Sequence, residues 1–214
     1  MMKITKIEPQ KRRKNRWSIF INGEFSFGIS ADDLYHLGLK EGQIIEKKEL
    51  KYIEDTILYT KGKDKALHLL SYRSRTEKEI RQRLYQESYP KRVIDRIVDF
   101  LYKYSFLDDK VFAEQFVKSK MQGKPMGKKM LVYQLEQKGV SKDIAEIVIA
   151  KQDINEVEAA YQLIKKRVNI MNITEFTLKE KQRVYNYLQR RGFSYDSIYQ
   201  VLDKLEKNIQ ENSN

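Results

Sequence analysis

The sequence predicts a mainly α-helical protein of tandem three-helix repeats that form an elongated, curved array, with a small N-terminal antiparallel β-sheet extension. Two observations predict this fold. One helix–turn–helix spacing of apolar residues occurs three times, and its central leucines, Leu84, Leu135 and Leu188, are 51 and 53 residues apart. Near the N-terminus, Lys3–Glu8 and Trp17–Ile21 instead alternate apolar and polar positions, as strands do. A long period that is carried by spacing rather than by residue identity is typical of helical repeats.

The second copy indicates how each repeat folds. Leu131 and Leu135 lie one helical turn apart, and Gly139 can adopt the left-handed conformation that ends a helix. Val140 then bridges to a helix capped by Ser141. The matching positions are Ile80, Leu84, Ser88, Tyr89, Ile97 and Val98 in the first copy and Val184, Leu188, Gly192, Phe193, Val201 and Leu202 in the third, with leading segments around Ala66, Ala113 and Ala160. Chance similarity among amphipathic helices is the alternative, but these positions keep their register across the turn.

The first residues are expected to form a small antiparallel sheet. Lys3–Glu8 and Trp17–Ile21 alternate like strands, and Asn22-Gly23 suits a type I′ hairpin turn. Phe25 and Phe27 then return along the next strand. We expect Trp17 and these phenylalanines on the buried side of the sheet, while stacking of Trp17 on a nucleobase is the alternative.

A helical connection is expected between the sheet and the repeats. Ser30 can cap a short helix that Gly38 closes, Ile44-Ile45 adds a short strand, and the helical pattern from Glu49 onward is expected to break or kink at Gly62. The predicted domains are the β-rich extension at residues 1–48, a connecting helix at 49–63, three-helix repeats at 64–109, 110–155 and 156–207, and a frayed tail at 208–214. We expect the hairpin to be accessory, so that removal of residues 3–27 leaves a folded repeat array.

The composition favours a polyanionic partner. Lysine and arginine number 42 against 30 aspartates and glutamates, which gives a net charge of +12. The excess is spread along the chain, as suits an extended basic surface, although a solvated surface without a partner is the alternative. The lack of cysteine excludes disulfides and thiolate metal sites, and no apolar run is long enough to span a membrane. We therefore expect a cytoplasmic protein that makes no membrane contact.

Three basic segments supply the candidate contacts to DNA or to a protein partner. These residues are Lys11, Arg12, Arg13, Lys14 and Arg16 at the tip of the first hairpin, Arg73, Arg75 and Arg81 near the start of the first repeat's second helix, and Lys118, Lys120, Lys124, Lys128 and Lys129 in the second repeat. A solvated loop is an equal alternative for the hairpin tip. Interleaved glutamates favour an ordinary charged face for the arginines, where Ser74 begins a capping box. The lysine run has no acidic residue from Gln115 to Leu135, which favours contact over solvation.

The sequence lacks the residue patterns of a catalytic or metal site. Gly123–Lys128 superficially resembles a phosphate loop, but its glycine spacing is one residue short and Lys129 stands where serine or threonine is required. Asp108-Asp109 has no third ligand nearby and is better explained as a helix cap. No nucleophile–base pair occurs either, so we expect a protein that is not an enzyme and binds no cofactor or metal.

Several motifs together resemble the RecX family of recombinase regulators. They are the tandem three-helix repeats, Arg73-Ser74-Arg75-Thr76 before Glu79-Ile80, Leu107-Asp108-Asp109 followed by Phe112-Ala113, Gly127 at the start of a helix pair, and Lys138-Gly139-Val140. The resemblance covers about residues 60–205, and the sheet resembles the extension of Gram-positive-type members. Glu87-Ser88-Tyr89 departs from the Lys-Gly-Tyr that the family tends to have.

The resemblance implies a modulator of RecA, the strand-exchange ATPase that polymerises on DNA. Such a protein binds the RecA filament along its groove and mainly inhibits filament extension, ATPase, strand exchange and coprotease activity in DNA repair and the SOS response. It also implies binding to single- or double-stranded DNA, and we expect a monomer. The alternative is a stand-alone DNA-binding protein with helix-turn-helix hairpins, although the third helices are apolar or acidic where base readout needs Arg, Asn or Gln.

Overall fold

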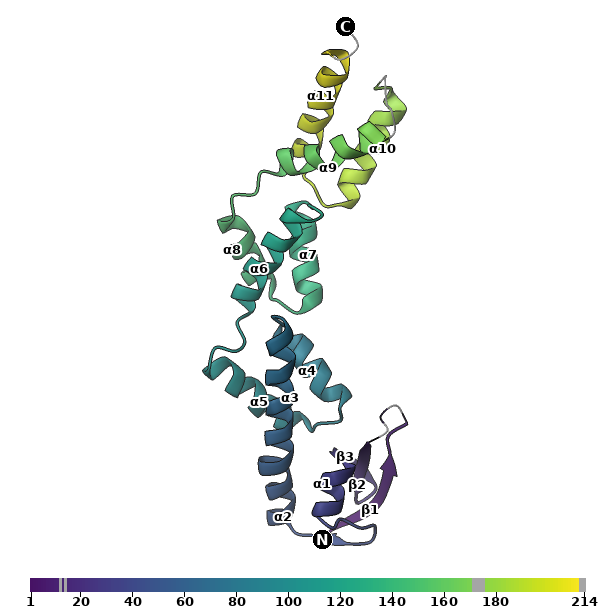
Figure 1. Ribbon diagram of the computed structural model, residues 1–214, viewed down its shortest axis with the longest axis vertical. Helices are drawn as coiled ribbons and strands as arrows, with labels where there is room; N and C mark the ends of the chain where they lie inside the picture. Colours follow the sequence, from purple (N-terminus) through teal and green to yellow (C-terminus); the bar gives the residue numbers. More distant parts are fainter. Residues whose placement is uncertain (12, 14, 171–175, 212–214) are drawn as a thin grey trace. The chain divides into compact units, whose positions relative to one another are not determined.

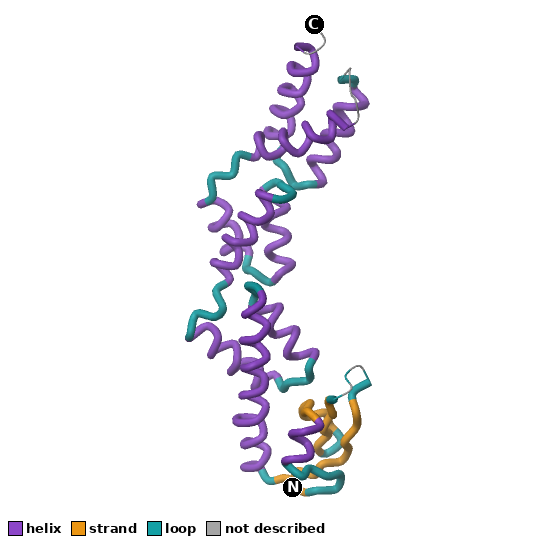
Figure 2. The backbone as a smooth tube through the Cα atoms, viewed as in Figure 1, coloured by secondary structure: helices purple, strands orange, loops and turns teal. Residues whose placement is uncertain are grey.

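The computed structural model describes residues 1–11, 13, 15–170 and 176–211. The chain divides into two compact units, Met1–Asp108 and Asp109–Asn214 (Figure 1). Within the described residues, strands occur in the first unit and the second unit is helical (Figure 2). The predicted fold class, tandem three-helix repeats with a small N-terminal sheet, is confirmed.

The N-terminal sheet contains four antiparallel strands in the order β3-β2-β1-β4. Its strands are β1 (Met2–Pro9), β2 (Arg16–Ile21), β3 (Glu24–Ser30) and β4 (Ile44–Ile45). Asn22 and Gly23 have φ values of 52° and 86°, so the two central residues of the β2–β3 turn both have the positive φ that a type I′ turn requires. The predicted hairpin turn is therefore confirmed.

A β-bulge separates the two phenylalanines of β3. Ile19 pairs with Phe27, whereas Phe20 pairs with Phe25, so the register shifts between the two pairs. Phe27 is fully buried, but Phe25 is 49% exposed and packs edge-on against Phe20 at 5.8 Å between ring centroids. The prediction that both phenylalanines are buried was wrong for Phe25, because one extra residue reverses which face the side chain takes.

The helices of the first unit are α1 (Ala31–His36), α2 (Lys47–Tyr52), the π-helical segment η1 (Ile53–Leu58), α3 (Tyr59–Tyr72), α4 (Glu77–Gln86) and α5 (Lys91–Lys103). Ser30 Oγ accepts a hydrogen bond from the Asp33 N–H at 3.1 Å, which confirms the predicted cap of α1. Of the predicted break or kink at Gly62, the break was wrong, because Gly62 lies inside α3. A Cβ there would lie 2.6 Å from Ile97 Cδ1, so this glycine permits close packing of α3 on α5.

The start of α4 and its end differ in detail from the prediction. Thr76, and not Ser74, caps α4, since its side chain accepts from the Glu79 N–H. After α4, Ser88 has φ 63° and so takes the left-handed conformation that glycine takes in the other repeats. Tyr89 follows it into the core with 4% of its surface exposed. The missing glycine therefore leaves the turn unchanged.

The sheet and the first repeat share one hydrophobic core. A single cluster of buried residues contains Ile4, Ile19 and Phe27 from the sheet together with Ile80 and Leu84 from α4. Backbone groups connect them too, because the Gly28 N–H donates to the Ser88 carbonyl at 2.8 Å. This shared core argues against the expectation that the hairpin is an accessory whose removal leaves the repeat intact.

The second unit contains two three-helix repeats. Its helices are α6 (Asp109–Gln122), α7 (Lys128–Lys138), α8 (Lys142–Lys151), α9 (Glu156–Ile170), α10 (Leu178–Arg190) and α11 (Tyr195–Glu211). Gly139 has φ 100° and Ser141 caps α8, as predicted. The equivalent residues Leu131, Leu135, Val184 and Leu188 are all buried. Helix α11 continues to Glu211, beyond the predicted start of the tail.

Two glycines bring the repeats of the second unit into backbone contact. The Gly127 N–H at the start of α7 donates to the Arg191 carbonyl at 3.0 Å. A Cβ on Gly127 would lie 2.0 Å from the Gly192 carbonyl oxygen, and one on Gly192 would lie 2.5 Å from Met130. The contact therefore requires a residue without a side chain at position 127.

We expect Phe27→Ala to lower the free energy of unfolding by about 3–5 kcal/mol, because it removes a fully buried ring. Since the core is shared, amide exchange in α4 and α5 should accelerate along with exchange in the strands. Phe25→Ala is the matched control and should change little. Faster exchange confined to the strands would contradict a shared core.

We expect Gly127→Ala to destabilise the second unit by about 1–3 kcal/mol, because the added methyl group collides with the Gly192 backbone. Denaturant unfolding of the full chain measures the effect. Gly123→Ala is the control, since a Cβ there would meet only Ser119 O, at 3.3 Å. Equal stability of the two variants would refute the close approach.

Candidate functional site

The predicted contact residues at the hairpin tip differ in their surroundings. Lys11 is exposed, whereas Arg12 and Lys14 lie outside the described residues. Arg16 Nη2 donates to the carbonyls of Gly28 at 3.0 Å and Glu87 at 2.7 Å. Its guanidinium also lies 5.0 Å from the centre of the Tyr89 ring. Arg16 therefore joins the sheet to the first repeat, and its hydrogen bonds are directed inward.

Glu87 is a buried carboxylate at this junction, with 4% of its surface exposed. Its Oε1 atom lies 3.0 Å from Arg13, 3.3 Å from Lys65 and 3.6 Å from Arg83. A buried charge is stable only when it is paired, and here cations from the hairpin, α3 and α4 all reach the same oxygen. Burial raises the pKa of the neighbouring Tyr89 phenol, although Arg16 opposes this, so the phenol stays neutral at physiological pH.

The predicted arginines of the first repeat pair with acceptors within their own unit. Arg73 pairs with Glu79 at 3.0 Å, and Arg81 pairs with Glu77 and Asp95, both at 2.5 Å. Burial lowers the pKa of Arg81, but these hydrogen bonds raise it more. The main-chain carbonyl of Leu69 accepts from Arg75 Nε at 3.0 Å. This arrangement agrees with the ordinary charged face that the interleaved glutamates favour.

The lysine run of the second repeat is more accessible. Lys118, Lys124, Lys128 and Lys129 are exposed, while Lys120 is half-buried with its ammonium 5.2 Å from the centre of the Phe116 ring. The backbone N–H of Lys128 donates to Glu156 Oε1 at 2.6 Å, which fixes the start of α7 and leaves its side chain in solvent. The structure thus places two adjacent exposed lysines on the first turn of a helix.

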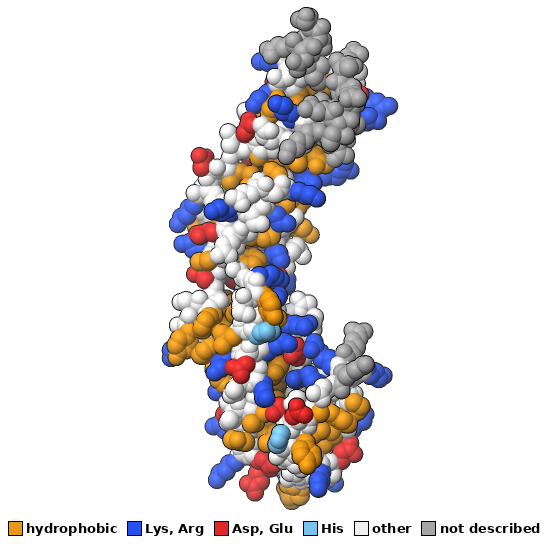
Figure 3. Space-filling view, viewed as in Figure 1, with side chains coloured by type: hydrophobic (Ala, Val, Ile, Leu, Met, Phe, Trp, Pro, Cys, Tyr) orange, Lys and Arg blue, Asp and Glu red, His pale blue; other side chains and the backbone are white. Residues whose placement is uncertain are grey.

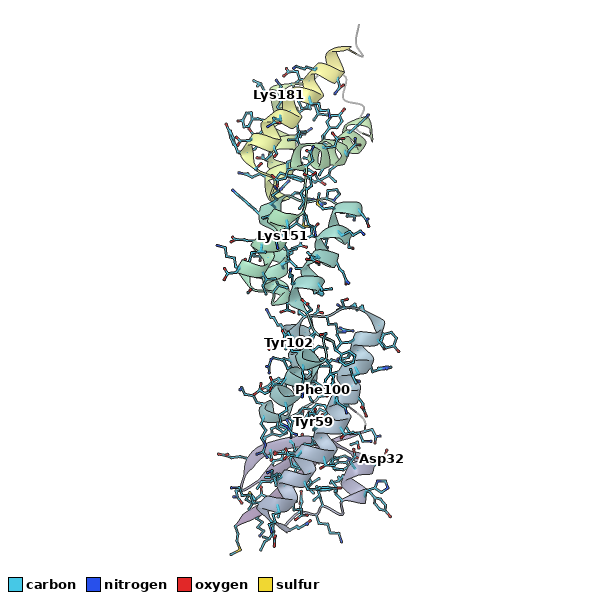
Figure 4. The ribbon with its side chains drawn as sticks, turned by 90° about the vertical axis from the view of Figure 1, so that its left-hand side faces the viewer. Asp32, Tyr59, Phe100, Tyr102, Lys151 and Lys181 are labelled. Atoms are coloured by element: carbon cyan, nitrogen blue, oxygen red, sulfur yellow. The ribbon has the colours of Figure 1, made fainter. Side chains whose placement is uncertain are left out.

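Lys118 also lines an open cleft beside α6 and α8. The cleft measures ≈ 450 Å³ and is lined by Glu114, Gln115, Lys118, Val148, Lys151 and Gln152. Figure 4 labels Lys151 on α8. Basic and acidic side chains both face this cleft, so it offers no single charge to a ligand.

Lys63 and Lys65, two basic groups near these sites, were missed from the sequence, and so was the convergence of cations on Glu87. Lys65 and Arg83 come from different helices, and only the fold brings them to Glu87. Lys63 lies 5.9 Å from the ring centre of Tyr59 and 5.3 Å from that of Phe100, two rings on α3 and α5 (Figure 4). A spacing of four residues between Tyr59 and Lys63 was the only available signal.

Basic side chains are distributed over both units on the face drawn in Figure 3, rather than gathered in one patch. Among the described residues, no group of three or more His, Cys, Asp or Glu is placed to hold a metal ion. No described helix is long and apolar enough to cross a membrane. The fold and these surfaces define a class of protein: tandem three-helix repeats with an N-terminal sheet, and basic side chains that are spread over both units.

Comparison with protein families identifies these parts in order along the chain. Residues 2–46 match the regulatory protein RecX N-terminal domain. Residues 63–101, 108–149 and 154–202 match the first, second and third three-helix domains of RecX. The chain belongs to the RecX family of regulatory proteins.

Relatives and solved structures agree with this assignment. Regulatory protein RecX of Clostridium botulinum (strain Alaska E43 / Type E3) is 37% identical over 204 residues, covering 94% of this chain and 95% of that protein. The Clostridium beijerinckii protein of the same name is 33% identical, with 96% of each chain covered. A crystal structure of regulatory protein RecX matches 95% of this chain and 100% of its own at 26% identity, with a TM-score of 0.65. That of RecX from Lactobacillus salivarius is 30% identical over 69% of this chain and 96% of its own, with a TM-score of 0.62.

Proposed function

We propose that this chain regulates the RecA recombinase by binding the RecA–DNA filament along its groove. Bound there, it mainly inhibits filament extension, ATPase, strand exchange and coprotease activity, and so limits DNA repair by recombination and the SOS response. The observation that carries the proposal is the ordered match to all four RecX domains along the chain. The name of its relatives, regulatory protein RecX, supports it.

The surface chemistry is compatible with this proposal. A filament groove presents DNA phosphates beside protein, and the exposed lysines of the second repeat suit such an anionic surface. The proposed partners are therefore the RecA filament and its single- or double-stranded DNA, and we propose that a monomer in the cytoplasm binds them. Under this proposal the protein is not an enzyme, because occupying a site on a polymer needs affinity and shape but no reactive group.

Inhibition of a polymer has a stoichiometric signature. One molecule that blocks a growing end or a groove affects many protomers, whereas competition for DNA requires enough protein to cover the DNA. The ratio at which inhibition begins therefore separates filament regulation from the alternative, a stand-alone DNA-binding protein.

We expect the ATPase rate of RecA on single-stranded DNA to fall when this protein is present well below one copy per RecA protomer. A titration of the full chain into preformed and growing filaments measures this. Inhibition that appears only at DNA-coating ratios, and that disappears steeply with added salt, would instead support direct DNA binding.

We expect Lys128→Ala combined with Lys129→Ala to weaken binding to the filament or to DNA by about tenfold, since two exposed ion pairs contribute together roughly 1–2 kcal/mol. Helical content should not change, because Glu156 holds the backbone and not the side chain of Lys128. Lys47→Ala with Lys48→Ala is the matched control, as these are also adjacent exposed lysines at a helix start. Unaltered inhibition by the first double variant would remove the lysine run from the mechanism.

A further inference from the structure

The cations around Glu87 form a site with excess positive charge, which we call the Glu87 cluster: Glu87, Arg13, Arg16, Lys65 and Arg83. A single carboxylate faces cations from the hairpin, α3 and α4. Arg16 of β2 donates to the main-chain carbonyl of the same residue. Asp33 of α1 is engaged elsewhere, by the Ser30 hydroxyl at 2.5 Å and by Lys61 at 3.8 Å. The cluster therefore keeps a net positive charge.

The members of the cluster divide into a support and a contact set. Arg16 is the support, because its guanidinium is held by two carbonyls and the Tyr89 ring. The contact set is Arg13, Lys65 and Arg83, whose side chains are 27%, 34% and 43% exposed. Each is anchored near Glu87 yet open to solvent on its other side. Such partly buried cations of fixed position are well suited to an anion from outside.

Charge rather than aligned hydrogen bonds holds Glu87 in this site. Within the described part of the chain, Glu87 Oε1 is buried without a hydrogen bond of good geometry, and so is Arg83 Nε. Arg83 Nε is closed to an outside ligand, but the side chains of Arg13, Lys65 and Arg83 are partly exposed, and each carries further N–H donors that another acceptor can meet. A phosphate oxygen has the charge and the acceptor geometry to use them.

We propose that the Glu87 cluster binds a phosphodiester of nucleic acid through Arg13, Lys65 and Arg83, and that Glu87 weakens this binding as an internal competing anion. This inference rests on the proposed function, because that function brings the protein to a filament that contains DNA. A nucleic acid fits better than an acidic protein surface because the exposed Lys11, two residues along the chain from Arg13, adds a further cation, and a phosphate backbone carries a charge at every nucleotide.

The competition sets the direction of each variant. Glu87→Gln removes the internal anion and keeps the size of the side chain, so affinity for single-stranded DNA rises about threefold or more at low salt. Lys65→Gln removes one contact, so affinity falls and the slope of log affinity against log salt becomes less negative by about 0.7. Lys48→Gln, which changes an exposed lysine of the same unit, is the charge-matched control and lowers the affinity for DNA less.

Fluorescence anisotropy of a labelled oligothymidylate with the full chain, without RecA and over a salt series, tests this proposal. Thermal unfolding establishes whether each variant folds. If the Glu87→Gln variant, which is changed at a buried position, fails to fold, Lys65→Gln alone provides the test. The proposal is overturned if folded Glu87→Gln binds no tighter, or if Lys65→Gln matches Lys48→Gln. A polyglutamate peptide of equal charge that responds to the same variants more strongly than the oligonucleotide would reassign the cluster to an acidic protein.

A parallel assay separates this inference from the proposed function. Each variant is titrated into the RecA ATPase reaction at low ratios. If the variants still inhibit RecA but bind DNA with the same affinity as the unmodified protein, the phosphate site is overturned and filament regulation is left intact. Altered DNA binding in a protein that never inhibits RecA supports the phosphate site and overturns the proposed function.

Discussion

The tight turn between the second and third helix of each repeat is the constraint on which the rest of the fold depends. Ser88, Gly139 and Gly192 all have positive φ, at 63°, 100° and 78°. The reversal places the next residue in the core, and Tyr89, Val140 and Phe193 are all buried there. Two of these turns also accept a backbone hydrogen bond from outside the repeat. The Gly28 N–H donates to the Ser88 carbonyl, and the Gly127 N–H donates to the Arg191 carbonyl. One local conformation thus serves both folding of the repeat and packing of its neighbour.

Positive charge in this chain has two separate roles. Arg16 lies at the junction of the sheet with the first repeat, where its guanidinium contacts two carbonyls and a ring at once. Lys128 and Lys129 lie on an exposed helix start instead. A net charge of +12 therefore overstates the charge offered to a partner, since part of it stabilises the fold. What remains in solvent is the part that counterion release can convert to affinity.

The sheet is an integral part of the first unit. It contributes Ile4, Ile19 and Phe27 to the core that also holds α4. Arg13 and Arg16 are also tied to Glu87 of the first repeat, so a contact made by either of them has a defined position on the first unit. Under the proposed function, side chains that are held in place, as those of Arg13 and Arg16 are, lose less conformational entropy on binding than mobile ones would. Residues 2–46, which match the N-terminal RecX domain, thus share a core with the first three-helix domain.

The sequence by itself determined the repeats, the hairpin turn and the family. Helix periodicity, the Asn22-Gly23 turn and the cap at Ser141 are local signals, because each depends on residues within a few positions. Only the tertiary structure decided which charges face solvent. Arg16 and Glu87 are distant in sequence, and nothing local indicates that a hairpin arginine meets a buried glutamate. The bulge that exposes Phe25 and the close approach at Gly127 likewise arise from pairing between segments, which periodicity cannot encode.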